Sequence, residues 1–162
     1  MTPAPTTPYS AQLGNREPIA SMRETSSRIR TLVMDWSPAQ FERTYAPGKW
    51  TARQILIHLA QTELALGNRA RMALTVPSYI AQPFEQDAWV AREPGTSGPD
   101  AVAVYHALRQ MNVVLFSALS PGERATPFTH PEYGALTVDW LIHQMAGHDH
   151  NHLAHLETID RR

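Results

Sequence analysis

The sequence of 162 residues predicts an all-α protein, a four-helix bundle with long connections between its helices. The first observation behind this fold class is that apolar residues recur every three or four positions in four stretches of about 20 residues. The second is that no stretch of any length alternates between apolar and polar residues, as a half-buried strand would. The third is that proline and glycine gather between these stretches. Amphipathic helices of this length bury their apolar stripes by packing together.

The N-terminal segment is expected to be separate from the helices. Residues 1–17 hold several prolines and little apolar content, so we expect a flexible arm there and a helical domain over residues 18–162. The first helix is expected from Pro18 to about Trp36. Proline suits the first turn of a helix, and a serine–proline pair follows the last apolar residue.

The second helix is expected to begin after Thr51. The sequence Thr51-Ala-Arg-Gln54 fits a capping box, in which the threonine hydroxyl and the glutamine side chain each accept a bond from a free N–H group. The helix should end near Leu74, shortly before Pro77. Its inward stripe is Ile55, His58, Leu59, Thr62 and Leu66.

The connection over residues 75–99 is long and rich in proline and glycine. Long connections in compact domains are often lids or binding loops. This one carries apolar residues that need cover, including Phe84 and Trp89, so we expect it to form a pocket wall.

The third helix is expected from Pro99 to Leu119, before a Ser-Pro-Gly sequence. The expected inward stripe is Val104, Leu108, Met111, Leu115 and Leu119. Residues 126–136 are polar and turn-rich, and no strand is expected in them. Thr137 is a suitable N-cap for the last helix, which should run to about Ile159.

The last helix points to a metal site. Its inward stripe is Leu141, Met145, His148, His152, His155 and Ile159. A spacing of four places His148 and His152 one turn apart on one face, where both rings can reach one ion, and His58 would arrive from the second helix. Three protein ligands leave a coordination position open, as in catalytic sites. The alternative is a set of core histidines with local hydrogen bonds, but burying several imidazoles without a common partner is costly.

Other candidate residues surround this set. His155 is expected to contact the ligands or line a pocket rather than to bind the metal. Trp50 is expected as a staple at a helix start and as a residue that contacts the ligands or lines the pocket. Trp89 is expected either to pack the long loop or to cover the metal. The remaining histidines, His106, His130, His143 and His150, are expected to be structural or exposed.

Charged residues near the histidines receive no catalytic role. Asp149 stands where a His-Glu-x-x-His zinc protease would carry its catalytic glutamate, and it is expected to be a solvated charge. Arg69 and Arg71 are expected on a solvated face, with binding of an anionic substrate as the less favoured alternative. The catalytic residues are therefore not identified by the sequence.

Composition limits the partners. The net charge of −1 gives no electrostatic case for binding nucleic acid or an anionic membrane, and the N-terminus does not resemble a signal peptide. No stretch is long and apolar enough for a membrane span, so a cytoplasmic protein that acts on a small molecule is expected. The chain has no cysteine, so any thiol in its chemistry must come from outside.

The motifs around these histidines resemble those of the DinB-like superfamily of four-helix bundles. They are Gly48-Lys-Trp-Thr51 leading into Ile55-Leu-Ile-His58-Leu, Met145-Ala-Gly-His148-Asp-His-Asn-His152-Leu, and the loop Pro83-Phe-Glu-Gln-Asp-Ala-Trp89. The resemblance covers roughly residues 18–160. It implies an up-up-down-down bundle, often a homodimer, and one divalent metal ion, usually zinc or nickel, on His58, His148 and His152. Relatives include bacillithiol transferases and mycothiol-dependent enzymes, in which the metal activates a low-molecular-weight thiol.

Two functions of different classes follow. The first is a metal-dependent enzyme that activates a low-molecular-weight thiol, or water, for attack on a small electrophile, which makes it a thiol S-transferase or a hydrolase. The second is a non-catalytic metal-binding protein of the stress response.

Overall fold

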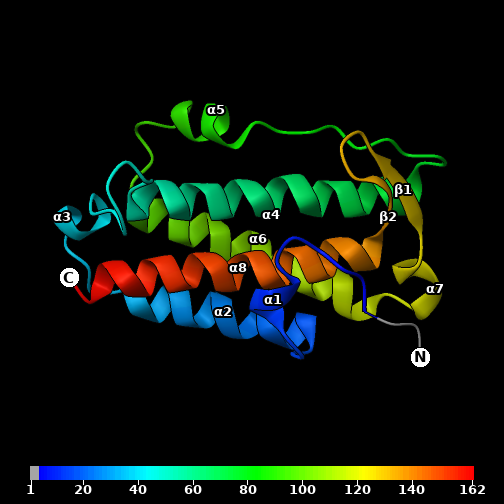
Figure 1. Cartoon of the computed structure of the whole chain (residues 1–162), viewed down its shortest axis with the longest axis horizontal. Helices are drawn as coiled ribbons and strands as arrows, with labels where there is room; N and C mark the ends of the chain where they lie inside the picture. The colour runs from blue at the N-terminus through cyan, green and yellow to red at the C-terminus, as the bar shows by residue number, and fades with distance from the viewer. Residues whose placement is uncertain (1–3) are drawn as a thin grey trace.

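Four long helices make up most of the computed structural model, which describes residues 4–162 (Figure 1). They are α2 (Pro18–Val33), α4 (Ala52–Thr75), α6 (Gly98–Ala118) and α8 (Val138–Asp160). The short elements are α1 (Ser10–Leu13), α3 (Pro38–Phe41), α5 (Gln86–Ala91), α7 (Pro121–Arg124), β1 (Pro127–His130) and β2 (Gly134–Thr137). The predicted four-helix bundle with long connections is confirmed. Within the described residues, no helix is long and apolar enough to cross a membrane.

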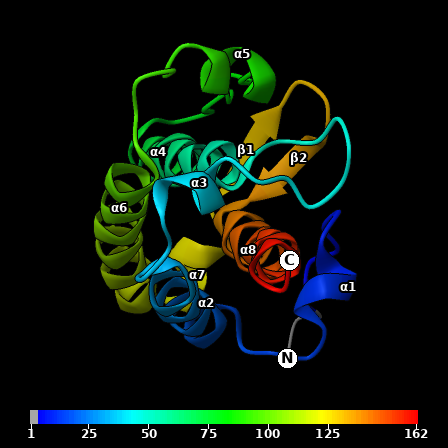
Figure 2. The same cartoon turned by 90° about the vertical axis from the view of Figure 1, so that its left-hand side faces the viewer.

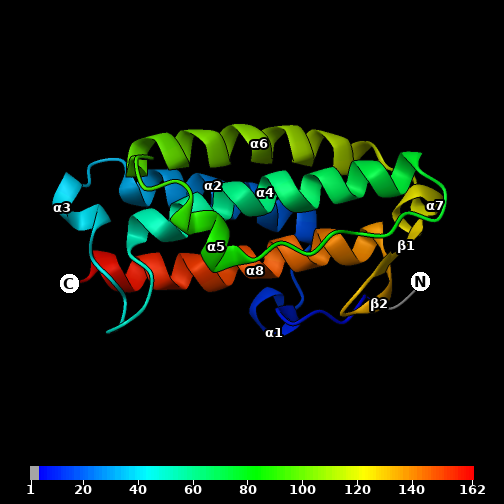
Figure 3. The same ribbon diagram turned by 90° about the horizontal axis from the view of Figure 1, so that it is seen from above.

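The long helices pack as a square. Both α2 and α4 contact α6 and α8, so α2 and α4 lie at opposite corners, as the view along the bundle shows (Figure 2). The pairing places the α4–α8 interface on one side of the bundle, and the connection between α4 and α6 passes over that side (Figure 3).

The helix directions differ from the expected up-up-down-down order. Ser21 bonds to His150 and Arg28 to Glu157, so α2 and α8 run in the same direction. The colour gradients show α4 and α6 running together in the opposite direction (Figure 1), which makes the order up-down-down-up. The reason is that residues 76–97 return along the whole bundle, whereas the other two connections reverse the chain at one end.

Local caps start the helices where the sequence predicts. The Thr51 hydroxyl accepts from the Gln54 N–H at 3.2 Å, and the Gln54 side chain accepts from the Thr51 N–H at 2.9 Å. Thr137 likewise accepts from the backbone N–H of Trp140 at 3.2 Å. These bonds satisfy N–H groups that have no partner inside the helix, so they fix where α4 and α8 begin.

A belt of buried polar residues crosses the middle of the bundle. Apolar core residues fill the two ends, in two separate clusters. Between the clusters, each long helix contributes polar side chains that are almost fully buried: Thr25 and Ser26 on α2, His58, Gln61, Thr62 and Glu63 on α4, Arg109 and Asn112 on α6, and His148, Asp149 and His152 on α8. Buried polar groups at this density are unusual in a core and mark the middle of the bundle as the candidate functional region.

The inward face of α6 was predicted wrongly. The helix buries Tyr105, Arg109 and Phe116, whereas Val104 and Met111, two of the residues expected inside, are about half exposed, at 49% and 52%. The face was misjudged because a buried arginine sits in the middle of it. An apolar stripe interrupted by a charge looks like a solvated surface in the sequence.

Two further segments differ from expectation. Residues 127–137, expected to lack strands, form an antiparallel hairpin in which Phe128 pairs with Leu136. The segment expected to be a flexible arm is packed: Leu13 is buried in the core, and α1 lies against α8 (Figure 2). A close approach at Gly147 permits this docking, because a Cβ there would lie 2.4 Å from the Tyr9 carbonyl oxygen. Residues 1–3 of the expected arm lie outside the described residues.

Candidate metal centre

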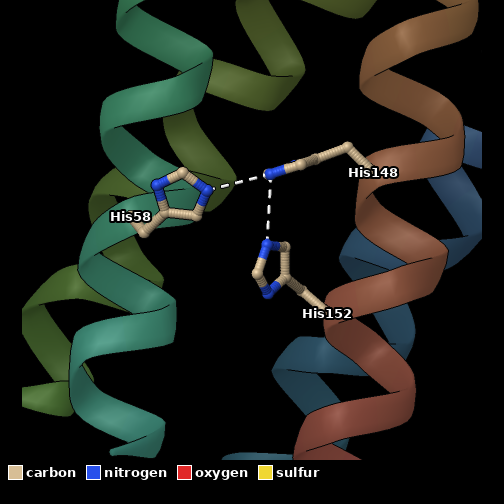
Figure 4. A group of neighbouring side chains, drawn as sticks. All are labelled: His58, His148 and His152. Atoms are coloured by element: carbon tan, nitrogen blue, oxygen red, sulfur yellow. Dashed lines mark hydrogen bonds between the residues drawn. The ribbon is translucent and has the colours of Figure 1, made fainter. Parts of the chain in front are cut away.

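Three histidines meet in the polar belt between α4 and α8 (Figure 4). The Nε2 atom of His148 lies 2.9 Å from His58 Nε2 and 3.1 Å from His152 Nε2. The three candidate ligand atoms all lie within 4.8 Å of one another. The structure thus brings together the three residues that the helical spacing singles out.

The three rings cannot all satisfy one another by hydrogen bonding. A neutral imidazole nitrogen carries either one proton or one lone pair, so His148 Nε2 can form one good bond to its two neighbours. The Nδ1 atoms of His58, His148 and His152 are also buried and have no partner among residues 4–162. A cation bound by all three Nε2 atoms would give each of these nitrogens a partner. In tetrahedral zinc sites, bonds of about 2.0–2.1 Å place the ligand atoms about 3.3 Å apart.

Burial keeps these rings neutral. Loss of solvation lowers the pKa of His58 to about 4. Burial also lowers the pKa values of His148 and His152 well below the usual value, with repulsion from the neighbouring histidines as a smaller cause. Neutral imidazole is the form that binds a metal, so the centre is in its ligand form at neutral pH.

The metal-free protein is expected to lose stability as the pH falls from about 6.5 to about 4. In this range the unfolded chain binds protons on histidines that stay neutral in the folded protein. The free energy of unfolding therefore decreases as the pH decreases. At about 1.4 kcal/mol per pKa unit, His58 alone contributes roughly 3 kcal/mol, present in full above pH 6.5. Urea unfolding at a series of pH values measures how steeply the free energy of unfolding depends on pH. The variant His58→Asn should show a weaker dependence. A free energy that stays constant over this range would contradict the expectation.

Two aromatic residues enclose the centre. The Trp50 ring lies 4.8 Å from the His58 ring, and the Tyr9 ring meets His148 edge-on at 5.2 Å. Trp50 therefore does contact a candidate ligand. Tyr9 comes from the segment expected to be a flexible arm, so no sequence signal pointed to it.

His155 lies beside the centre and outside the set of three. Its ring stacks on Tyr45 with 3.9 Å between the ring centres and meets His152 at 5.5 Å. Stacking on Tyr45 holds the ring away from the point where the other three meet. This position agrees with a residue that contacts a ligand or lines the site.

A pocket of about 170 Å³ adjoins His58 and His148. It lies between α4 and α8 and is covered by the connection 76–97 and by the β1–β2 hairpin. Two polar atoms that face this region, Thr62 Oγ1 and Gln144 Oε1, are buried and have no hydrogen-bond partner in the described part of the chain. The candidate centre therefore opens onto a space with unused hydrogen-bonding groups.

The long connection forms a wall of this pocket, but Trp89 does not. Phe84 lines the pocket, and Trp89 packs behind it with 4.9 Å between the rings. The Trp89 side chain is 37% exposed, because the short helix α5 buries Val90 and turns Trp89 outward. Of the two roles expected for Trp89, the structure shows packing within the loop, and Trp89 does not line the pocket.

Asp149 is buried, contrary to the expectation of a solvated charge. Its carboxylate forms an ion pair with Arg109 and accepts hydrogen bonds from Tyr105 at 2.9 Å and Thr25 at 3.1 Å. Its partners come from α6 and α2, far from Asp149 in the sequence, so the residues next to Asp149 could not predict its burial.

Arg69 and His130 are two further pocket residues that the sequence did not place there. Both line the pocket and are largely buried, at 9% and 4% exposed. His106 and His150 instead bond to serines of α2, and His143 bonds to a carbonyl of its own helix. These bonds agree with the expected structural roles of the three, and His130, which accepts from the backbone N–H of Glu132, lines the pocket in addition.

Comparisons with known proteins agree with this architecture. A protein of Oceanobacillus iheyensis with the provisional name of metal-dependent hydrolase is 27% identical over 135 residues, which cover 83% of this chain and 78% of the relative. YfiT of Bacillus subtilis, with the same provisional name, is 24% identical over 147 residues, which cover 89% of this chain and 83% of YfiT.

Solved structures share the fold. The structure of YfiT, described as an unusual four-helix bundle topology, has a TM-score of 0.84 at 21% identity and covers 100% of this chain and 93% of its own. The structure of a mycothiol-dependent maleylpyruvate isomerase has a TM-score of 0.72 at 15% identity. The match covers 96% of this chain and 63% of the isomerase chain. The sequence profile of the DinB superfamily matches residues 21–156. The chain belongs to the DinB superfamily.

Proposed function

We propose that the protein binds one divalent metal ion, zinc or nickel, through His58, His148 and His152 and uses it to activate a low-molecular-weight thiol or water for attack on a small electrophile. The observation that carries this proposal is the meeting of three buried, neutral imidazoles beside a pocket. The names of the relatives support the metal dependence, and the mycothiol dependence of one structural neighbour supports a thiol.

The residues present suit such an ion. Imidazole nitrogen is a good ligand for zinc and nickel, and a set without thiolates or carboxylates leaves the ion its full charge. When bound, the ion would act as a Lewis acid that lowers the pKa of a thiol or water in its open position. Because the chain has no cysteine, a thiol nucleophile would have to enter from solution.

The protein itself supplies shelter and orientation. Trp50 and Tyr9 pack on the candidate ligands and hold bulk water away from them. Thr62 Oγ1 and Gln144 Oε1 offer hydrogen bonds to a bound reactant. The pocket volume of about 170 Å³ fits a small molecule rather than a polymer.

A cytoplasmic homodimer completes the proposal. The superfamily resemblance implies the dimer, and α6 offers an exposed apolar face for it in Val104, Met111 and Val114, which are 49%, 52% and 70% exposed. Such a face is more common at an interface than on the surface of a monomer.

The proposal is tested by turnover with and without thiol. Zinc- and nickel-loaded protein and metal-stripped protein would be assayed on monochlorobimane and on a panel of esters, with bacillithiol, mycothiol, a simple thiol or water as nucleophile. We expect turnover only in the loaded protein. Equal rates after metal removal would refute the mechanism. Absence of turnover across the panel would favour the non-catalytic metal-binding protein of the stress response.

A further inference from the structure

Arg69 carries a largely buried charge that forms no ion pair with a carboxylate of the described residues. Its side chain is 9% exposed, and its nitrogens have no carboxylate oxygen within 4.0 Å in residues 4–162. One nitrogen donates to the carbonyl oxygen of Gln82, and the guanidinium lies 5.8 Å from the centre of the Phe84 ring. A second arginine, Arg109, is fully buried and pairs with two carboxylates.

A buried guanidinium without a counter-ion is costly unless a ligand supplies the charge. Within the chain, Glu132 lines the same pocket and attracts Arg69 at longer range without forming an ion pair with it. Arginine offers several N–H donors in a planar fork that matches a carboxylate. Arg69 is therefore placed and left free to bind an anion that enters the pocket.

The pocket connects Arg69 to the candidate metal centre. His58, Thr62, Leu66 and Arg69 lie on one face of α4 and all line it. His58 and Arg69 are eleven positions apart on the helix, which places their backbones about 16 Å apart at 1.5 Å per residue. Even with the reach of the arginine side chain, one ligand that contacts both ends must be elongated.

The middle of the pocket is apolar. Leu66 lies between His58 and Arg69 on α4, and Leu136 from β2 and Leu141 from α8 also line the pocket. Beside them stand the unpaired Thr62 Oγ1 and Gln144 Oε1. His130 accepts from the Glu132 N–H through Nδ1 at 3.2 Å, which leaves Nε2 as the N–H donor of its neutral ring. The lining thus offers a cationic end, an apolar middle with a few polar contacts, and the histidine end.

We propose that this pocket binds an elongated small molecule that carries a carboxylate, with the carboxylate on Arg69, an apolar middle against Leu66 and Leu141, and the opposite end at the three histidines. Arg69 thereby selects acidic over neutral reactants. Only the reacting end rests on the proposed function, because the carboxylate site is complete without a metal.

The test compares an acid with its neutral amide on metal-free protein. Calorimetric titration at pH 7.5 with 4-phenylbutanoate and 4-phenylbutanamide should show the acid binding at least about tenfold more tightly, the usual gain of a charge-assisted hydrogen bond. In Arg69→Gln the preference should disappear. Equal binding of acid and amide, or a preference that survives in Arg69→Gln, would overturn the proposal.

The matched control is Arg71→Gln. Arg71 has the same charge on the same helix, bonds to Gly67 and Asn112, and does not line the pocket, so its loss should leave the preference intact. A second readout needs no variant: the acid should shift the indole N–H signal of Trp140, which lines the pocket, and not that of Trp36. Failure of metal binding leaves both measurements valid, so the two proposals can fail separately.

A further titration on zinc-loaded protein tells which reactant carries the carboxylate. If it is the thiol, 6-mercaptohexanoate should bind more tightly than 6-mercaptohexanol, and Arg69→Gln should remove the difference. If the two thiols bind equally in both proteins, the carboxylate belongs to the electrophile.

Discussion

Replacing Arg109 with methionine is expected to destabilise the protein by about 3–5 kcal/mol, because it would leave two buried carboxylates without a counter-charge. The Arg109 side chain is fully buried and forms ion pairs with Glu63 of α4 and Asp149 of α8. It also donates to the Met22 carbonyl of α2 at 3.1 Å. One side chain from α6 thus joins all four long helices at the middle of the bundle.

Urea unfolding followed by circular dichroism measures this loss. The control is Arg28→Met, since Arg28 pairs with Glu24 and Glu157 on the surface, where all three side chains are 32–56% exposed. Surface ion pairs contribute about 0–1 kcal/mol, so the control should change little. Similar losses in the two variants would show that the buried network does not hold the helices together.

Features with local causes could be predicted from the sequence. The start of α4 depends on Thr51 and Gln54, which are three residues apart, and the start of α8 depends on Thr137 in the same way. The pairing of His148 with His152 follows from the helical repeat alone. His58 could be added because it lies on the inward stripe of α4.

Features that depend on distant partners could not be predicted. Asp149 is buried because Arg109 faces it from another helix. The same arginine made the inward face of α6 look solvent-exposed in the sequence, so that face was predicted wrongly. Tyr9 reaches His148 because Gly147 lets the N-terminal segment approach. The place of Arg69 in the pocket wall depends on how residues 76–97 return along the bundle, which no short-range pattern records.

Replacing His148 with alanine is expected to weaken zinc binding by more than about 100-fold, beyond the 10–100-fold loss usual for a residue that only supports a ligand. His148 stands between the other two histidines, with its Nε2 atom 2.9 Å from one and 3.1 Å from the other. Its loss would leave two ligands on different helices. Competition with a chromophoric chelator at pH 7.5, where the rings are neutral, measures the affinity.

The control for this variant is His143→Ala. His143 lies on the same helix, and its Nδ1 atom bonds to the Asp139 carbonyl at 2.9 Å, outside the group of three. Zinc affinity should stay within about twofold of the unaltered protein. An equal loss in the two variants would indicate a general effect on α8 rather than removal of a ligand.

The metal content of purified protein tests the central claim most directly. After equilibration with zinc at pH 7.5 and gel filtration, elemental analysis should find one zinc ion per chain in the unaltered protein and in His143→Ala. The double variant His148→Ala/His152→Ala should retain almost none. Full metal content in the double variant, or none in the unaltered protein, would contradict the assignment of His58, His148 and His152 as the metal ligands.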